Sequence, residues 1–282
     1  MYYKVTLKIP FEILPEVEEK FYLIASSGWE ERDFEGVREF SFYFKDKDLA
    51  SLEALEKFVA SYPQIKISYT LVKEENWAEL WKANFRPLKV GQRLVIVPPW
   101  ESYVPEKEEV VIFIEPGQAF GTGHHPTTQM MLEHIEKYFF EKQNAVVKVL
   151  DLGCGTGILS IACALLCPGA EVVAVDIDEE ALKATLYNAK LNKVEKKIKT
   201  YDQVPEGETF DLVLANIGFK ELKKLAMELK KVASSKGTVY FLSGVLKEDM
   251  AELKKHYQSL GYRFLSSQTF KEWSFLAFKF FS

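Results

Sequence analysis

A glycine-rich segment near the middle of the chain has the spacing of a nucleotide-binding loop. Asp151-Leu-Gly-Cys-Gly-Thr-Gly157 follows an apolar run and precedes a stretch with helical spacing. Glycines at a strand-to-helix turn let the backbone turn tightly and approach a ligand, which then meets the free N–H groups where the helix starts. We therefore expect Asp151, Gly153 and Gly155 to contribute to a cofactor site.

The glycine spacing separates two classes of cofactor. A dinucleotide site has G-x-G-x-x-G, whereas this loop has G-x-G-x-G and carries Ile158 at the place of the third glycine. Asp176 ends the next apolar strand, about 20 residues beyond the loop, where a carboxylate accepts hydrogen bonds from both ribose hydroxyls. Both classes of cofactor contain a ribose. Asp176 therefore supports a nucleoside cofactor but does not distinguish between the two classes.

Two further segments carry residues suited to a ligand. In the loop EPGQAFGTGHHPTT (115–128), Gly121 lets the backbone approach a ligand, and Phe120 offers a ring face to a sulfonium cation or an adenine. Thr128 stands at a predicted helix start, where a carboxylate is favoured. Asn216 ends the predicted strand of FDLVLANI (210–217), beside the crevice in which open α/β sheets bind ligands.

The histidines and cysteines give no metal or disulfide pattern. His124 and His125 are adjacent and have no Cys or acidic partner at metal-ligand spacing, so we expect no metal site and favour a loop-ordering or substrate-facing role. Cys154, Cys163 and Cys167 are odd in number and cannot form a closed disulfide framework. We expect Cys154 in the turn, and Cys163 and Cys167 on the apolar face of a helix that packs in the core.

The elements that must position these residues alternate from Val147 onward. Strand, loop and helix patterns recur, which predicts a parallel sheet with helices on both faces. Two β runs, 262–270 and 273–281, follow without a helix between them and predict an antiparallel hairpin at the sheet edge. The predicted fold of this part is therefore α/β and Rossmann-like.

The N-terminal part has a different pattern. Strand patterns at 2–10, 37–44 and 65–72, a short one at 29–34, and helical patterns at 12–28 and 49–62 give the order β-α-β-β-α-β of a ferredoxin-like α+β module. A helical stretch at 74–85 follows. We divide the chain into an N-terminal domain at 1–72, a linker helix at 73–90 and a catalytic domain at 91–282.

Composition limits the remaining possibilities. The chain has 282 residues, of which 48% are hydrophobic and 27% charged, and its net charge is −5. This charge gives no global attraction to nucleic acid. Residues 2–9 alternate like a strand rather than a signal peptide, and no apolar run reaches membrane-spanning length. We expect a cytoplasmic protein, without DNA or membrane partners, and a monomer.

Taken together, these segments resemble the bacterial ribosomal protein L11 methyltransferases, within the class I methyltransferases that use S-adenosyl-L-methionine. The resemblance runs through almost the whole chain. The stretches that carry it are NWAELWKANFRPLKVGQRLVIVPPW (76–100), the loop 115–128, VLDLGCGTGILSIA, VVAVDIDEEAL with Asn188, FDLVLANI, TVYFLSGVL and the late Trp273.

The resemblance implies an enzyme that methylates lysine side chains and the N-terminal amine of ribosomal protein L11, free or on the ribosome, and releases S-adenosyl-L-homocysteine. It also implies that the N-terminal domain recognises the protein substrate while the linker helix lets it swing. Thr128, Gly153, Asp176 and Asn216 match the family's cofactor-binding positions. For catalysis we expect Asn216 to orient the amine and Phe120 to cover the methyl group.

Three alternatives stay open at this point. The first is a methyltransferase of the same class that acts on another protein, an RNA or a small amine. The second is a nicotinamide dehydrogenase, which the glycine spacing disfavours. The third is a module that keeps the fold without catalysis, against which the intact loop, Asp176 and Asn216 argue.

Overall fold

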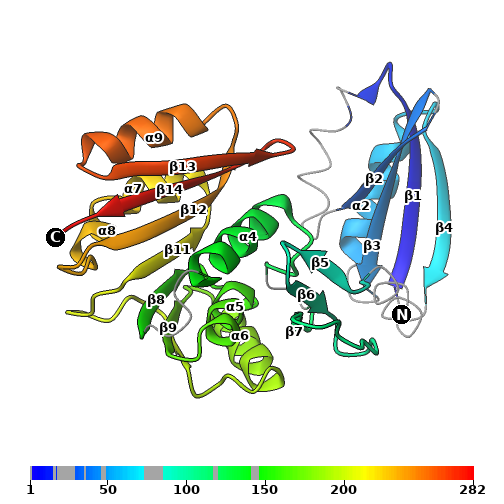
Figure 1. Cartoon of the computed structure of the whole chain (residues 1–282). Helices are drawn as coiled ribbons and strands as arrows, with labels where there is room; N and C mark the ends of the chain where they lie inside the picture. Colours follow the sequence, from blue (N-terminus) through cyan, green and yellow to red (C-terminus); the bar gives the residue numbers. More distant parts are fainter. Residues whose placement is uncertain are drawn as a thin grey trace. The chain divides into compact units, whose positions relative to one another are not determined.

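The chain forms two compact units, Met1–Phe85 and Arg86–Ser282 (Figure 1). The structure is a computed structural model that describes residues 2–14, 17, 29–34, 36–45, 49–72, 85–116, 120–140 and 146–282. Among these residues no helix combines the length and the apolar character needed to cross a bilayer.

The first unit contains an antiparallel sheet with the strand order β2-β3-β1-β4. Its elements are β1 (Tyr2–Pro10), β2 (Trp29–Phe34), β3 (Val37–Lys45), α2 (Leu49–Ala60) and β4 (Lys66–Val72). This strand order places β3 between β1 and β2, as the predicted split βαβ module requires. The strands and the helix predicted at 49–62 are confirmed, whereas most of the helix predicted at 12–28 lies outside the described residues.

Alternation along the strands builds the core of this unit. On β1, Val5, Leu7 and Ile9 are buried, and on β3 Phe40, Phe42 and Phe44 are buried in the same cluster. Because side chains of a strand alternate between its faces, these residues share one face of the sheet. Helix α2 contributes Leu55 to the same cluster and thereby closes the core.

The second unit is built on a seven-stranded sheet with the order β10-β9-β8-β11-β12-β14-β13. Its strands are β8 (Val147–Leu152), β9 (Ala170–Val175), β10 (Ile198–Tyr201), β11 (Leu212–Asn216), β12 (Thr238–Leu246), β13 (Arg263–Phe270) and β14 (Trp273–Phe280). The five strands from β10 to β12 in this order are parallel. Strand β14 pairs antiparallel with β12 on one side and with β13 on the other. This confirms the Rossmann-like sheet and the hairpin.

Helices cover both faces of this sheet (Figure 1). They are α4 (Pro126–Phe140), α5 (Ile158–Leu166), α6 (Glu179–Leu191), α7 (Phe219–Leu225), α8 (Glu228–Lys231) and α9 (Met250–Ser259). Along β11, Leu212 and Leu214 belong to the core shared with α4 and α5, whereas Val213 and Ala215 belong to the core shared with α7, α8 and α9. A strand buried on both faces is typical of parallel sheets.

A three-stranded sheet packs on the α4–α5 side. It consists of β5 (Leu88–Val90), β6 (Leu94–Val97) and β7 (Val110–Phe113), in the order β5-β6-β7. Val90, Leu94, Ile96 and Ile112 belong to the same core as α4 and α5. Strands β6 and β7 coincide with two apolar runs of the sequence, at 93–100 and 110–116.

Three predictions about elements need correction. In the predicted linker helix at 73–90, the last three residues form strand β5 instead. Residues 73–84 lie outside the described residues. Apolar spacing over 221–233 predicts one helix, whereas the structure has two, α7 and α8, although the backbone keeps helical angles at Ala226 and Met227 between them. Strand β10 is not among the predicted elements, because it is only four residues long.

Candidate functional site

The glycine-rich loop lies at the carboxyl end of β8, where the sheet topology opens a crevice. The backbone N–H groups of Gly153 and Cys154 donate to the Val175 carbonyl oxygen, at 2.8 and 3.1 Å. This pair of bonds ties the loop to the end of β9. Asp176, the next residue on that strand, is therefore held beside the loop.

Both carboxylate oxygens of Asp176 accept backbone hydrogen bonds. The N–H of Gly155 donates to Oδ2 at 3.0 Å, and the N–H of Asp178 donates to Oδ1 at 3.1 Å. These bonds fix the carboxylate at the mouth of the loop. Since an ionised carboxylate accepts about four hydrogen bonds, it still has capacity for the two hydroxyls of a ribose.

The 120–123 segment lies directly against the glycine loop. Gly155 has a positive φ of 54°, and a Cβ at this position would overlap the carbonyl oxygen of Phe120. The N–H of Thr156 donates to this same oxygen at 2.9 Å, and Thr156 Oγ1 donates to the Gly121 carbonyl at 2.5 Å. Only glycine fits at position 155, because the two backbone segments touch there.

A cavity of about 500 Å³ opens above this loop. Its lining residues are Phe120, Leu152, Gly153, Gly155, Val175, Asp176, Ile177, Asp178, Ala181, Asn216, Ile217, Gly218, Glu221 and Leu225. The volume falls in the range of about 300–1,000 Å³ that small-molecule and cofactor sites occupy. Among the described lining residues three are acidic and none is basic, so the cavity favours a ligand that carries positive charge.

Asn216 brings an unsatisfied acceptor to the cavity. Its Oδ1 atom is buried and has no hydrogen-bond partner, while its Nδ2 lies 3.4 Å from Thr128 Oγ1. A buried polar atom without a partner costs free energy, so its persistence points to a ligand that supplies a donor. Thr128 is 1% exposed and stands behind Asn216, at the start of α4.

Asp151 lies beneath the loop rather than on the cavity wall. It is fully buried, and its Oδ2 accepts hydrogen bonds from Ser160 N at 3.1 Å and from Ser160 Oγ at 2.6 Å. Burial raises the pKa of Asp151 to about 6, against the opposing effect of the two Ser160 bonds. Its other oxygen, Oδ1, has no hydrogen-bond partner.

Three rings form a cluster beside the cavity. The ring centroid of His125 lies 5.4 Å from that of Phe120 and 4.8 Å from that of Trp273, both in edge-on contact. His125 Nδ1 lies 2.7 Å from Thr127 Oγ1. Burial lowers the pKa of His125, so the imidazole is neutral at neutral pH. Phe120 itself is 55% exposed.

The structure brings most of the predicted site residues together. Phe120, Gly153, Gly155, Asp176 and Asn216 all line the cavity. Three others are not among its lining residues and instead support the residues that are: Gly121 accepts from Thr156, Thr128 contacts Asn216, and Asp151 holds the start of α5.

Sequence reasoning missed several residues of the cavity wall. Ile177 follows Asp176 and is 96% exposed, an unusual exposure for an isoleucine. Its position after a strand-end carboxylate is a signal that could have singled it out. Glu221 and Leu225 line the cavity from α7, and no spacing rule identifies them in the sequence.

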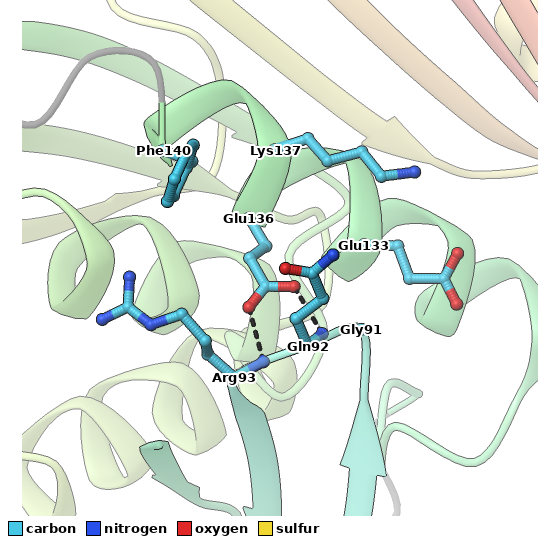
Figure 2. Close-up of a pocket in the computed structure, with 7 residues that line it drawn as sticks. All are labelled: Gly91, Gln92, Arg93, Glu133, Glu136, Lys137 and Phe140. Carbon is cyan, nitrogen blue, oxygen red and sulfur yellow. Dashed lines mark hydrogen bonds between the residues drawn. The ribbon is translucent and has the colours of Figure 1, made fainter. Parts of the chain in front are cut away.

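A second hollow, of about 450 Å³, lies between α4 and the turn that joins β5 to β6 (Figure 2). Its one buried charge, Glu136, accepts hydrogen bonds from the backbone N–H groups of Gln92 and Arg93, at 2.8 and 2.7 Å. The carboxylate is thus used to hold the turn. In the described part of the chain no group of three or more His, Cys, Asp or Glu side chains is arranged to hold a metal ion.

Comparisons with known proteins identify the family of the chain. The family model for ribosomal protein L11 methyltransferase (PrmA) matches residues 16–280. A ribosomal protein L11 methyltransferase of Citrifermentans bemidjiense is 43% identical over 217 residues, which are 74% of this chain and 69% of the relative. The enzyme of the same name from Geotalea uraniireducens is 37% identical over 259 residues, covering 84% of this chain and 81% of the relative.

A solved structure supports the same assignment. The crystal structure of ribosomal protein L11 methylase from Lactobacillus delbrueckii subsp. bulgaricus superposes with a TM-score of 0.62 at 29% identity, and the match covers 69% of this chain and 98% of that one. The family match spans both units and includes the glycine loop, Asp176 and Asn216. The chain therefore belongs to the ribosomal protein L11 methyltransferase family.

Proposed function

We propose that this protein transfers methyl groups from S-adenosyl-L-methionine to lysine side chains and to the N-terminal amine of ribosomal protein L11. The observation that carries the proposal is the buried, unpartnered Oδ1 of Asn216 on the wall of an acidic cavity beside the glycine loop. An amine N–H supplies the donor that this oxygen lacks. The relatives named for this reaction support the choice of protein substrate.

The residues present fit the cofactor. The carboxylate of Asp176 would hold the ribose hydroxyls, Gly153 and Gly155 would let the amino-acid portion lie over the loop, and Thr128 would support that portion from the start of α4. In the part of the wall that the structure describes, three side chains are acidic and none is basic, which matches a sulfonium cation. The neutral product S-adenosyl-L-homocysteine would be held less tightly for the same reason.

The reaction requires little more from the protein than the positioning of the methyl donor and the amine. When bound, S-adenosyl-L-methionine supplies an activated methyl group: the N–C bond forms as the C–S bond breaks, the electron pair stays on sulfur, and the amine proton passes to solvent. Asn216 orients the attacking nitrogen through Oδ1. Phe120 lines the cavity, and its ring would cover the reacting atoms.

The attacking amine has to be neutral. A free lysine has a pKa of about 10.4, so the site must favour the uncharged form. Partial burial beside Phe120 and the adjacent sulfonium charge both disfavour a second cation. No described residue of the cavity wall is a histidine or a lysine, and we assign no dedicated base among them.

The first unit completes the proposal. We assign residues 1–72 to recognition of the ribosomal protein and residues 73–87 to the connection between the units, since the chain divides near Phe85 and β5 begins at Leu88 within the second unit. We further propose that the enzyme acts as a monomer in the cytoplasm, on the free protein or on the ribosome. The free, buried thiols of all three cysteines are compatible with a reducing compartment.

Tandem mass spectrometry tests which atoms receive the methyl groups. Unmethylated ribosomal protein L11 is incubated with the enzyme and S-adenosyl-L-methionine, digested and mapped. We expect methyl groups on lysine Nζ and on the N-terminal nitrogen, and a loss of both with Asn216→Ala. Methylation confined to other side chains, or unchanged turnover with Asn216→Ala, would refute the proposed chemistry or the proposed role of Asn216.

A further inference from the structure

Helix α6 carries a buried asparagine, Asn188, near its C-terminal end, and a second buried asparagine, Asn192, caps that end one turn later. Asn188 is 1% exposed and Asn192 is 9% exposed. Asparagine is a poor helix former, and its buried amide is tolerated only where its hydrogen bonds are made. The Asn188 amide bonds backbone groups of other elements, whereas the Asn192 amide bonds Phe113 and also the Asn188 carbonyl oxygen one turn back.

The two side chains bind the segment that follows β7. Asn192 accepts from the Phe113 N–H at 2.8 Å through Oδ1 and donates to the Phe113 carbonyl at 2.6 Å through Nδ2. Asn188 Oδ1 accepts from the N–H of Glu115 at 2.9 Å. The pair thus takes the place of a neighbouring strand, because it satisfies the backbone at alternate residues of an extended segment.

Asn188 also reaches the glycine loop, which Asn192 does not. Its Nδ2 donates to the Thr156 carbonyl at 2.9 Å. Thr156 in turn donates through its N–H to Phe120 O at 2.9 Å and through Oγ1 to Gly121 O at 2.5 Å. Both Asn188 and Thr156 are buried. One chain of bonds therefore links Glu115, α6, the glycine loop and the backbone of Phe120.

We propose that Asn188 is a positioning residue for the cofactor site: through Thr156 it sets the glycine loop and the Phe120 backbone in the arrangement that the cofactor requires. Gly155, whose N–H holds Asp176 at 3.0 Å, directly precedes Thr156 in the loop. A shift of Thr156 would therefore displace both the Asp176 carboxylate, which is proposed to bind the ribose, and the ring of Phe120. This inference rests on the proposed function.

Asn192 provides a matched control. It caps the same helix, is also buried and binds the same segment, but it makes no contact with the glycine loop in the described hydrogen bonds. Asn188→Ala and Asn192→Ala should both lower the melting temperature. Only Asn188→Ala should weaken the binding of S-adenosyl-L-homocysteine, measured by calorimetry on the full chain, by about tenfold or more.

Kinetics separate positioning from general loss of stability. For Asn188→Ala we expect kcat to fall and the KM for S-adenosyl-L-methionine to rise, while the KM for ribosomal protein L11 stays within about twofold. For Asn192→Ala we expect kcat and both KM values to stay within about twofold of the wild-type values. Equal cofactor affinity in the two folded variants would overturn the proposal.

A second variant decides the matter if Asn188→Ala does not fold. Thr156→Val keeps the shape of the side chain and removes only the Oγ1 bond to Gly121. We expect cofactor affinity to fall by about threefold or more, and unchanged affinity would overturn the inference. A wild-type protein that does not bind the cofactor would overturn the proposed function as well, whereas tight wild-type binding with unaffected variants would overturn the positioning role alone.

Discussion

At the scale of single residues, Asp176 is the side chain on which cofactor recognition depends most. Two backbone N–H groups already hold its oxygens, so the carboxylate is oriented before any ligand arrives. Orientation in advance lowers the entropy that binding must overcome. The same two bonds explain why a close amide analogue should not replace it.

Replacing Asp176 by asparagine should weaken cofactor binding strongly. The amide would turn one donor group toward either the Gly155 or the Asp178 N–H, and it would remove the charge that strengthens hydrogen bonds to the ribose. We expect the Kd of S-adenosyl-L-homocysteine to rise by about 10- to 100-fold, as measured by calorimetry. A Kd within twofold of wild type would remove Asp176 from the cofactor site.

Asp151 should make the stability of the free protein depend on pH. Its pKa is raised to about 6 in the folded state, so the folded protein binds this proton more tightly than the unfolded chain does. The stabilisation is complete below the unfolded pKa of about 3.9 and is lost as the pH rises through about 6. Relative to Asp151→Asn, the free energy of unfolding should fall by on the order of 3 kcal/mol between these values.

Urea unfolding of both proteins between pH 4 and pH 7.5 measures this difference. The comparison with Asp151→Asn cancels the titration of all other groups that the two proteins share. A difference that stays constant over this range would show that the Asp151 carboxyl titrates alike in the folded and unfolded states.

At the scale of elements, the turn between β5 and β6 depends on one side chain of α4. Glu136 accepts from the N–H groups of Gln92 and Arg93, and its Oε2 fills the space where a Cβ of Gly91 would lie (Figure 2). Gly91 has a φ of +65°, so the turn requires glycine for two reasons, its backbone angle and this contact. The turn and the helix therefore depend on each other.

Glu136→Gln should destabilise the second unit without affecting its cofactor site. The glutamine amide can accept only one of the two backbone bonds, so a part-buried N–H loses its partner at a cost of about 1 kcal/mol. Glu133→Gln is the control, since this neighbour accepts a single bond from the Gln268 side chain. Thermal unfolding measures the loss of stability, and the further shift of the melting temperature with S-adenosyl-L-homocysteine measures cofactor binding. Equal melting temperatures in the two variants would count against the turn-holding role.

Periodicity in the sequence predicted most of the elements, because core strands and helices bury regular positions. The buried run of β11 and the alternating Val5, Leu7 and Ile9 of β1 show this directly. The split between α7 and α8 could not be predicted, since Leu222, Ala226 and Leu229 continue a helical spacing across it. Strands β5 and β10 are too short to show a period.

The candidate site was predictable where local backbone geometry restricts the residue type. Gly153 and Gly155 have positive φ, and Asp176 ends a strand next to them. The links made by Asn188 and Thr156 join segments more than thirty residues apart, so no local spacing reveals them. The same holds for Glu221, which reaches the cavity only because α7 follows β11 in the fold.

At the scale of the whole molecule, the two units have separate cores. The cluster around β1 and β3 contains only residues of the first unit, and the two clusters around the large sheet contain only residues of the second. Every residue of the proposed cofactor cavity also belongs to the second unit. Cofactor binding and recognition of the protein substrate can therefore be separated by experiment.

A fragment of residues 86–282 should fold and bind the cofactor on its own. We expect its Kd for S-adenosyl-L-homocysteine to stay within about threefold of the full chain, and its rate of L11 methylation at low substrate concentration to fall by about tenfold or more. Calorimetry and a methyl-transfer assay on the two proteins check this. Full methylation by the fragment would show that the first unit does not recognise the substrate.

The most direct test of the account is the intact mass of ribosomal protein L11 after incubation with the enzyme and S-adenosyl-L-methionine. We predict mass increases in steps of one methylene with the wild-type chain, and none with Asp176→Ala at the same enzyme concentration. An unchanged L11 mass in the presence of a wild-type enzyme that binds the cofactor would contradict the proposed substrate. An unchanged mass without cofactor binding would contradict the assignment of the glycine loop itself.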